Sequence, residues 1–292
     1  MKTLTAICAI AILTGCGNLA TAPRTHPDIA RGGFVVEGAE NTPIDWNGTL
    51  LIVVNTGNGF YVLDFSTRSI ISKQVITKMD TVSAIVDSGT LYVFGSNMIT
   101  PERSLSPGGQ ILMVSSTNLL DWSQPVSVIQ AAPDLAIGNT SVTKSPDGFV
   151  MAYDTRAPGY ADYSYRFAYS KNLTDWIPIG GVFSPDEYTS CPAIRYEDGY
   201  YYVFHLRRRD KQFVTMVSRS TDLISFENQR SEYAVLSPVG HPEDGNATTD
   251  LDLVEFGWIV YLTYSAGDQQ TWGHIKYATY NGSLKKLMAL YF

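Results

Sequence analysis

The hydrophobic positions after residue 30 fall in short runs, some alternating and some continuous, and turn residues separate them. This spacing is typical of β-strands, and it lacks the 3.6-residue period of an amphipathic helix. Five of the runs end in a tight glycine turn that is followed at once by another apolar, mostly aromatic strand. The turns contain Gly48, Gly89, Gly148, Gly199 and Gly257. Their spacings of 41, 59, 51 and 58 residues are close to the length of one four-stranded propeller blade.

A second motif recurs in the same phase as the glycine turns. It has a serine, then Asn-Leu or Asp-Leu two residues later, and an aromatic residue six positions after the serine. Its three clear copies are Ser116–Trp122, Ser170–Trp176 and Ser220–Phe226. Two motifs in register predict an all-β fold, a five-bladed β-propeller of four-stranded antiparallel blades. We expect this single domain to span residues 31–292.

The predicted register also assigns a functional face. In a blade the first strand lines the central channel, and successive strands alternate in direction. The glycine turns and the serine-motif hairpins therefore share one face, while the starts of the first strands share the opposite face with the loops between second and third strands. Because functional residues concentrate on loops held by a rigid scaffold, we expect the site on that opposite face. Counting back from the turns places its channel mouth near Ala39, Asp80, Asn139, Ser190 and Thr248.

The first sixteen residues are typical of an export signal. Lys2 precedes an apolar run of about ten residues, which is too short to span a bilayer as a helix. The run ends in Leu-Thr-Gly-Cys, which resembles the bacterial lipobox and predicts a signal peptide over residues 1–16 with lipidation of Cys16. Gly17 is not the aspartate of inner-membrane retention, so we expect a lipid-anchored protein of the bacterial cell envelope, in the outer membrane. Residues 17–30 are expected to form a flexible tether.

Composition narrows the classes of partner. A net charge of −7 argues against nucleic acid and against electrostatic attachment to anionic lipid. Cys8 is expected to leave with the signal peptide and Cys16 to carry the lipid, so the folded domain retains only Cys191 and has no intramolecular disulfide. We expect Cys191 to be a small buried apolar residue and the protein to be a monomer.

The predicted functional face is rich in carboxylates, amides, basic groups and aromatic rings. Carboxylates transfer protons, arginine and histidine bind hydroxyl or acidic groups, and rings stack on sugars, so the set is typical of a carbohydrate pocket. The predicted catalytic residues are Asp80, Glu187 and Asp250. The predicted substrate-binding residues are Asn139, Arg156, His205, Arg207, Asp252, Asp268, Trp272 and His274. Asp250 and Asp252 are two apart in a strand, so they are expected to point the same way and to split their pKa values.

These motifs resemble those of the family 43 glycoside hydrolases and related five-bladed clans, over the whole mature chain. The stretch Ser190–Tyr202 (SCPAIRYEDGYYY) is similar to the segment that carries the general acid of that family. The resemblance implies hydrolysis of a glycosidic bond by an acid and a base carboxyl group, with inversion. The sequence departs from the family twice: Ser190 stands where the family has its acid glutamate, and the Asp-Pro base is missing from the first repeat. Glu187 is the nearest substitute acid.

The function predicted from these residues is a glycoside hydrolase, exo-acting on a plant or algal poly- or oligosaccharide. Ser190 favours one alternative, a non-catalytic carbohydrate-binding lipoprotein of a glycan-uptake system. A second alternative is a glycan phosphorylase similar to family 130, which would hold phosphate with the run Arg207–Arg209. No cofactor and no metal in the site are expected, and a structural calcium ion in the channel is left open. The expected partner is a carbohydrate, and the membrane is contacted only through the lipid anchor.

Overall fold

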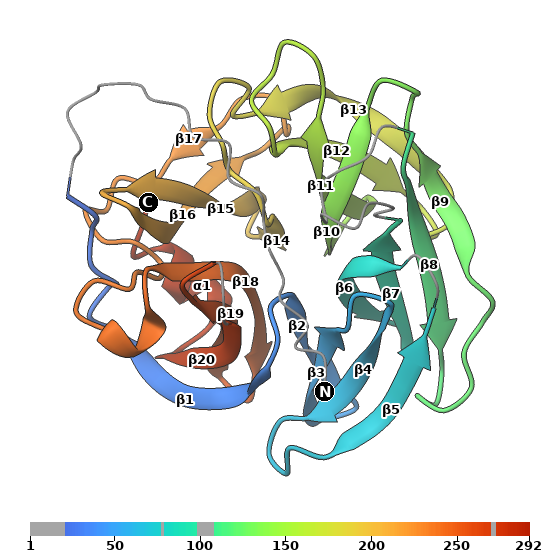
Figure 1. Ribbon diagram of the computed structural model, residues 1–292, viewed down its shortest axis with the longest axis horizontal. Coiled ribbons are helices and arrows are strands. Elements are labelled where there is room, and N and C mark those ends of the chain that lie inside the picture. The colour runs from blue at the N-terminus through green and yellow to red at the C-terminus, as the bar shows by residue number, and fades with distance from the viewer. Residues whose placement is uncertain (1–20, 77–78, 98–107, 270–272) are drawn as a thin grey trace.

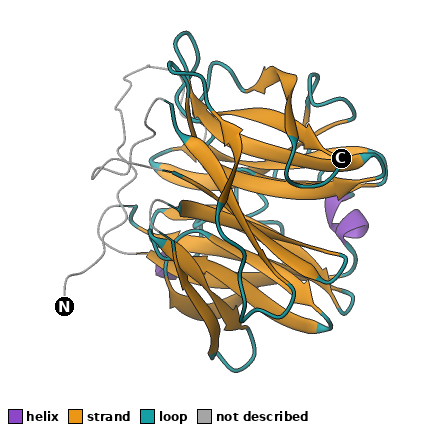
Figure 2. Cartoon of the chain, turned by 90° about the vertical axis from the view of Figure 1, so that its right-hand side faces the viewer, coloured by secondary structure: helices purple, strands orange, loops and turns teal. Residues whose placement is uncertain are grey.

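The computed structural model describes residues 21–76, 79–97, 108–269 and 273–292. Within these residues the protein is built almost entirely of antiparallel β-strands (Figure 2). The helical elements described are short: the 3-10 turn η1 (Pro242–Asp244) and helix α1 (Leu284–Met288). The all-β prediction is therefore confirmed.

Three four-stranded antiparallel sheets follow one another along the sequence, each with its strands in sequence order. The first sheet contains β2 (Asn41–Trp46), β3 (Thr49–Asn55), β4 (Gly59–Asp64) and β5 (Ile70–Val75). The second sheet contains β6 (Asp80–Asp87), β7 (Thr90–Ser96), β8 (Gln110–Ser116) and β9 (Val126–Gln130). The third sheet contains β10 (Ala136–Ser145), β11 (Gly148–Arg156), β12 (Ser164–Ser170) and β13 (Trp176–Phe183).

The remaining strands form one eight-stranded sheet made of two antiparallel parts. One part contains β14 (Ala193–Glu197), β15 (Tyr200–Arg209), β16 (Gln212–Ser220) and β17 (Glu227–Asn228). The other contains β18 (Ala247–Phe256), β19 (Ile259–Gly267), β20 (Gly273–Asn281) and the N-terminal strand β1 (Ile29–Glu37). A single parallel pair, Phe213 with Ala247, joins the two parts between β16 and β18.

The sheets surround a central axis in a propeller-like ring, with β2, β6, β10, β14 and β18 innermost (Figure 1). Buried hydrophobic clusters fill the spaces between neighbouring sheets. One cluster joins Val35 of β1 and Ile275 of β20 to Ile52 of β3, so it closes the ring between the N-terminal and C-terminal strands. Burial of such apolar surface contributes roughly 25 cal/mol per Å², which makes the inter-sheet clusters the main source of stability.

The two recurring motifs form the turns that the sequence predicts. Asn47 and Gly48 have φ of 51° and 80°, the left-handed pair that a type I′ hairpin requires. In the serine motif of the third sheet, Ser170 Oγ accepts a hydrogen bond from the Leu173 amide at 2.9 Å. The aromatic residue of the motif then packs on the preceding sheet, as Trp122 does against Phe60 with ring centroids 4.8 Å apart. The motifs therefore close hairpins and join neighbouring sheets.

The N-terminal region is described only from residue 21, so the expected signal peptide and Cys16 lie outside the described residues. The described part of the expected tether is held against the domain, because the His26 amide donates to the Ala234 carbonyl at 3.1 Å. Strand β1 begins at Ile29, two residues before the expected domain start, and Ile29 is buried. In the described part of the protein, no helix has the length and apolarity needed to cross a membrane.

Candidate functional site

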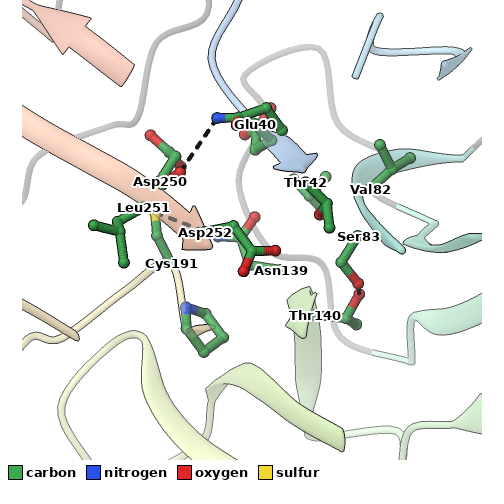
Figure 3. Close-up of a pocket in the computed structure, with 13 residues that line it drawn as sticks. Glu40, Thr42, Val82, Ser83, Asn139, Thr140, Cys191, Asp250, Leu251 and Asp252 are labelled. Atoms are coloured by element: carbon green, nitrogen blue, oxygen red, sulfur yellow. Dashed lines mark hydrogen bonds between the residues drawn. The ribbon is translucent and has the colours of Figure 1, made fainter. Parts of the chain in front are cut away.

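A small cavity opens at one end of the axis, where the innermost strands begin (Figure 3). Its volume is about 30 Å³, enough for a water molecule or a hydroxyl group but not for a sugar ring. The lining residues come from the starts of the inner strands of all the sheets. They are Glu40, Asn41, Thr42, Thr81, Val82, Ser83, Asn139, Thr140, Cys191, Pro192, Asp250, Leu251 and Asp252. The cavity lies on the face that the sequence predicts to be functional.

Several strands depart from regular β-structure at this cavity. Strands β6, β10 and β18 each have a register shift at the cavity, next to Thr81, Asn139 and Asp250 respectively. Thr81 and Asp250 have φ of 50°, and Cys191 has φ of 56°. Left-handed conformations are costly for non-glycine residues and concentrate at functional sites, while bulges re-aim side chains. Left-handed residues and register shifts therefore coincide at this cavity, which makes it the candidate site.

Hydrogen bonds tie neighbouring inner strands together around the cavity. The Ser83 and Thr140 hydroxyls lie 2.7 Å apart between the second and third sheets. Asn41 Nδ2 donates to the backbone carbonyl of Asp250 at 3.3 Å, between the first sheet and β18. These contacts hold the lining residues in place before any ligand binds, which lowers the entropic cost of binding.

Among the carboxyl groups that line the cavity, Asp250 has a raised pKa and no cationic partner in the hydrogen bonds and ion pairs described for it. Burial raises its pKa, against the opposing effect of hydrogen bonds from the Cys191 thiol and the Thr249 hydroxyl. Thr249 Oγ1 donates to Asp250 Oδ2 at 2.6 Å. A carboxyl group whose pKa is raised in a cavity is suited to give up a proton during a reaction.

Asp154 lies directly behind the cavity wall, on β11. It is fully buried, and its Oδ2 accepts hydrogen bonds from Asn139 Nδ2 at 2.6 Å, from the Cys191 amide at 3.2 Å and from Ser190 Oγ at 3.3 Å. Burial raises its pKa to about 8, and the nearby charge of Asp250 adds to this. Two of its donors, Asn139 and Cys191, also line the cavity, so Asp154 is connected to the site through them.

Asp252 is the other carboxyl group on β18 that lines the cavity, and an arginine balances its charge. Arg195 Nη2 forms an ion pair with Asp252 Oδ1, and the Leu253 amide donates to the same oxygen at 2.8 Å. Burial raises the pKa of Asp252, while the Arg195 charge opposes the rise. Arg195 also lines a second, larger cavity of about 280 Å³ at the other end of the axis. The ion pair therefore separates the two cavities.

Comparison with known proteins gives a fold but no close relative. No family model matches the sequence, and no curated protein matches it significantly. Among solved structures, the BT0996 RGII complex is similar with a TM-score of 0.65 and 15% identity, over 88% of the present protein and 92% of its counterpart. The GH43 endo-arabinanase from Bacillus licheniformis has a TM-score of 0.60 and 13% identity, over 86% and 96%. The Cellvibrio cellulosa α-L-arabinanase complexed with arabinohexaose has 0.61 and 11%, over 88% and 98%.

The protein shares the fold of the family 43 glycoside hydrolases. The resemblance predicted from the recurring motifs is thus confirmed at the level of fold. Within this family 43 fold, Ser190 is fully buried and has φ of 34°. It donates to Asp154 rather than facing the cavity, so it offers the site no proton donor.

The predicted catalytic residues are only partly brought together. Asp250 lines the cavity, whereas Asp80 lies beside it: Asp80 is buried, and its Oδ1 accepts from Asn55 Nδ2 at 2.7 Å. Glu187 is away from the axis, with a side chain that is 59% exposed and ion-paired to Arg207 Nη1. Asp250 is therefore the one member of the predicted set on the cavity surface.

Among the predicted binding residues, Asn139 and Asp252 line the cavity and the described others do not. His205 is a correction: it is 3% exposed, its Nε2 lies 3.0 Å from Ser218 Oγ, and burial lowers its pKa to about 4. A neutral core histidine packed on Phe183 cannot contact substrate. Arg207 is held by Glu187, and Arg156 Nε lies 3.1 Å from Asp162 Oδ1.

The predicted binding residues of the last sheet lie farther out. His274 pairs with Glu37 at 2.7 Å on the outer strands β20 and β1, so it is remote from the axis. Asp268 follows β19 and is partly exposed, outside the cavity lining. Trp272 lies outside the described residues. The strand alternation assumed for Asp250 and Asp252 is interrupted by the register shift between Thr249 and Asp252, although both line the cavity.

Three functional candidates were missed in the choice of site residues: Asp154, Glu40 and Cys191. Asp154 had a usable signal, because counting the β10–β11 ladder back from its turn brings Asp154 opposite Asn139, and the register shift at this point moves its partner by only one residue, to Gly138. Cys191 was expected to be a buried apolar residue, but it is half-buried, lines the cavity and bonds to Asp250. Among the described residues, no group of three or more His, Cys, Asp or Glu side chains is arranged to hold a metal ion.

Proposed function

We propose that the protein is a glycoside hydrolase that acts at the axial cavity, with Asp250 as the general acid. The observation that carries this proposal is the raised pKa of a carboxyl group that lines a cavity built from strained, bulged strands. A protonated Asp250 would donate to the glycosidic oxygen as the bond to the anomeric carbon breaks. The family 43 fold supports the class of reaction but does not supply the residues.

Glu40 is the proposed partner of Asp250. It lines the same cavity from the segment before β2, and its Oε2 accepts a hydrogen bond from Asn55 Nδ2 at 2.7 Å. An ionised Glu40 would take a proton from the water that attacks the anomeric carbon. An acid and a base separated by room for water correspond to an inverting mechanism.

The cavity volume constrains how a substrate would bind. A space of about 30 Å³ accepts one hydroxyl group or the attacking water, so the sugar ring would lie across the mouth. This fits recognition of a terminal residue, and we propose exo action on a plant or algal oligosaccharide. Two similar structures are named arabinanases, and one holds arabinohexaose, so arabinose-containing oligosaccharides are the first candidates. We further propose that the two parts of the eight-stranded sheet are separate blades, which gives five in all.

A panel of arabinan, xylan and pectic oligosaccharides would test the proposal. We expect the purified protein to release reducing sugar from at least one of them without added phosphate. Products should be identified by chromatography, because exo action releases a single small sugar from the start. Binding without release, measured by calorimetry on the same panel, would contradict hydrolysis.

A non-catalytic glycan-binding protein is the second candidate, and specific contacts favour it. Ser190 replaces the family acid, and Asp252 and Glu187 are neutralised by Arg195 and Arg207. The ion pair between Arg207 and Glu187 argues against the phosphorylase alternative, because Arg207 is already paired with a carboxylate and is not free to hold phosphate. The oligosaccharide panel distinguishes these candidates. Binding without sugar release would indicate the glycan-binding protein, and sugar release that requires added phosphate would indicate the phosphorylase.

The cellular setting is proposed from the N-terminal sequence. A lipid on Cys16 would anchor a monomeric domain to the outer membrane of a bacterial cell envelope. We expect labelled palmitate to be incorporated by the full-length protein in a bacterial host, and Cys16→Ser to lose all of this label. Equal labelling of wild type and Cys16→Ser would contradict the anchor.

A further inference from the structure

Two buried oxygen atoms behind the cavity accept no hydrogen bond from the described residues. They are Oδ1 of Asp154 and Oδ1 of Asn139. Buried polar atoms without a partner are rare and call for a physical explanation. The other terminal atoms of the same two side chains are already joined, because Asn139 Nδ2 donates to Asp154 Oδ2 at 2.6 Å.

We infer that Asp154 is a neutral carboxylic acid whose Oδ1–H donates to Oδ1 of Asn139, so that the two side chains form a cyclic acid–amide pair. One proton then provides a partner for both orphaned oxygens. A protonated carboxyl group is a donor through one oxygen and an acceptor through the other, which is the complement of an amide. The proton resides on Oδ1 because three donors already occupy Oδ2.

The surroundings of Asp154 favour the neutral form. The titratable groups that face it are Asp250 from β18, Cys191 from the segment before β14 and Tyr165, its pairing partner on β12. None of these carries a positive charge, and Asp154 itself is fully buried. An ionised carboxylate without a cationic partner is expensive in such a place, and the pKa of about 8 agrees with this.

The pair makes Asp154 a positioning residue for the cavity. It fixes the amide of Asn139 in the wall, and in its neutral form it places no negative charge beside Asp250. Ionisation of Asp154 would break the pair, release the Asn139 amide and place a charge beside the proposed proton donor. If the proposed hydrolysis is correct, this predicts a loss of activity as the pH rises through about 8. The pair itself can be tested without any substrate, so its failure is distinguishable from the failure of the proposed function.

Infrared spectroscopy of the full-length protein is the direct test. At pH 6 we expect a protonated carboxyl carbonyl band that shifts in D₂O and fades as the pH rises through about 8. Asp154→Asn should remove this band, while Asp121→Asn, in an exposed hairpin at the opposite end of the sheets, should retain it. A spectrum of wild type at pH 6 that equals the spectrum of Asp154→Asn would overturn the inference.

Thermal unfolding gives a second readout. The folded pKa of Asp154 lies above its unfolded value of about 4, so its contribution to stability is complete below pH 4 and is lost as the pH rises through about 8. Asp154→Asn can keep an amide–amide pair with Asn139, so its Tm should stay within about 3 °C of the wild-type Tm at pH 6. Between pH 6 and pH 9 its Tm should fall less than that of the wild type. The Tm of Asn139→Asp should fall more than that of the wild type over the same range. A loss of Tm in Asp154→Asn as large as in Asp154→Ala would contradict the pair.

Discussion

Asp250→Asn is expected to lower the rate of glycoside hydrolysis by at least about 100-fold, because an amide cannot transfer the proton that a general acid supplies. The fold should persist. Asparagine keeps the shape of the side chain, and it tolerates the φ of 50° at this position better than most residues do. Its Oδ1 can still accept from Thr249 Oγ1, and the backbone contact with Asn41 is unchanged.

The loss should appear in kcat, with Tm and glycan binding close to those of the wild type. Asp186→Asn is the matched control, because Asp186 is an exposed carboxylate outside the cavity lining. It should retain full activity. An Asp250→Asn variant with wild-type turnover would remove Asp250 from the mechanism. An equal loss in both variants would point to a general effect of charge.

The fold could be predicted from the sequence because its signals are local. A turn such as Asn47-Gly48 needs left-handed backbone at both positions, and few residue pairs provide it. The serine motif likewise specifies its hairpin through contacts within seven residues, as at Ser170. Repetition of such local units along the sequence then predicts a ring of antiparallel sheets.

The site was harder to predict because it depends on the backbone departing from that regularity. Counting residues back from the turns assumes an unbroken ladder, but β6, β10 and β18 shift register at the cavity. A shift of one residue exchanges the faces of a strand, which is why Thr81 lines the cavity while Asp80 does not. Burial cannot be read from the sequence either: it makes His205 a core residue, and it raises the pKa of Asp154 to about 8.

Arg195→Met is expected to destabilise the fold by about 3–5 kcal/mol, because it leaves Asp252 buried without its cation. Arg195 satisfies several acceptors at once: it pairs with Asp252, and its Nε donates to the Leu253 carbonyl at 3.0 Å. The expected fall in Tm is about 10 °C for a domain of this size. The double variant Arg195→Met, Asp252→Asn should recover much of the loss, because neither member of the ion pair is then left buried without its counter-charge.

The pH dependence of this loss gives the sharper test. Without Arg195, the pKa of Asp252 rises further, because the Arg195 charge no longer opposes the effect of burial. A raised folded pKa contributes stability that is lost as the pH increases, so the deficit of Arg195→Met should be larger at pH 8 than at pH 5. Chemical denaturation at both values, with the double variant as reference, measures it. A deficit equal at the two values would show that Arg195 acts through packing and its hydrogen bonds to carbonyls, and that the ion pair with Asp252 is not what stabilises the channel between the two cavities.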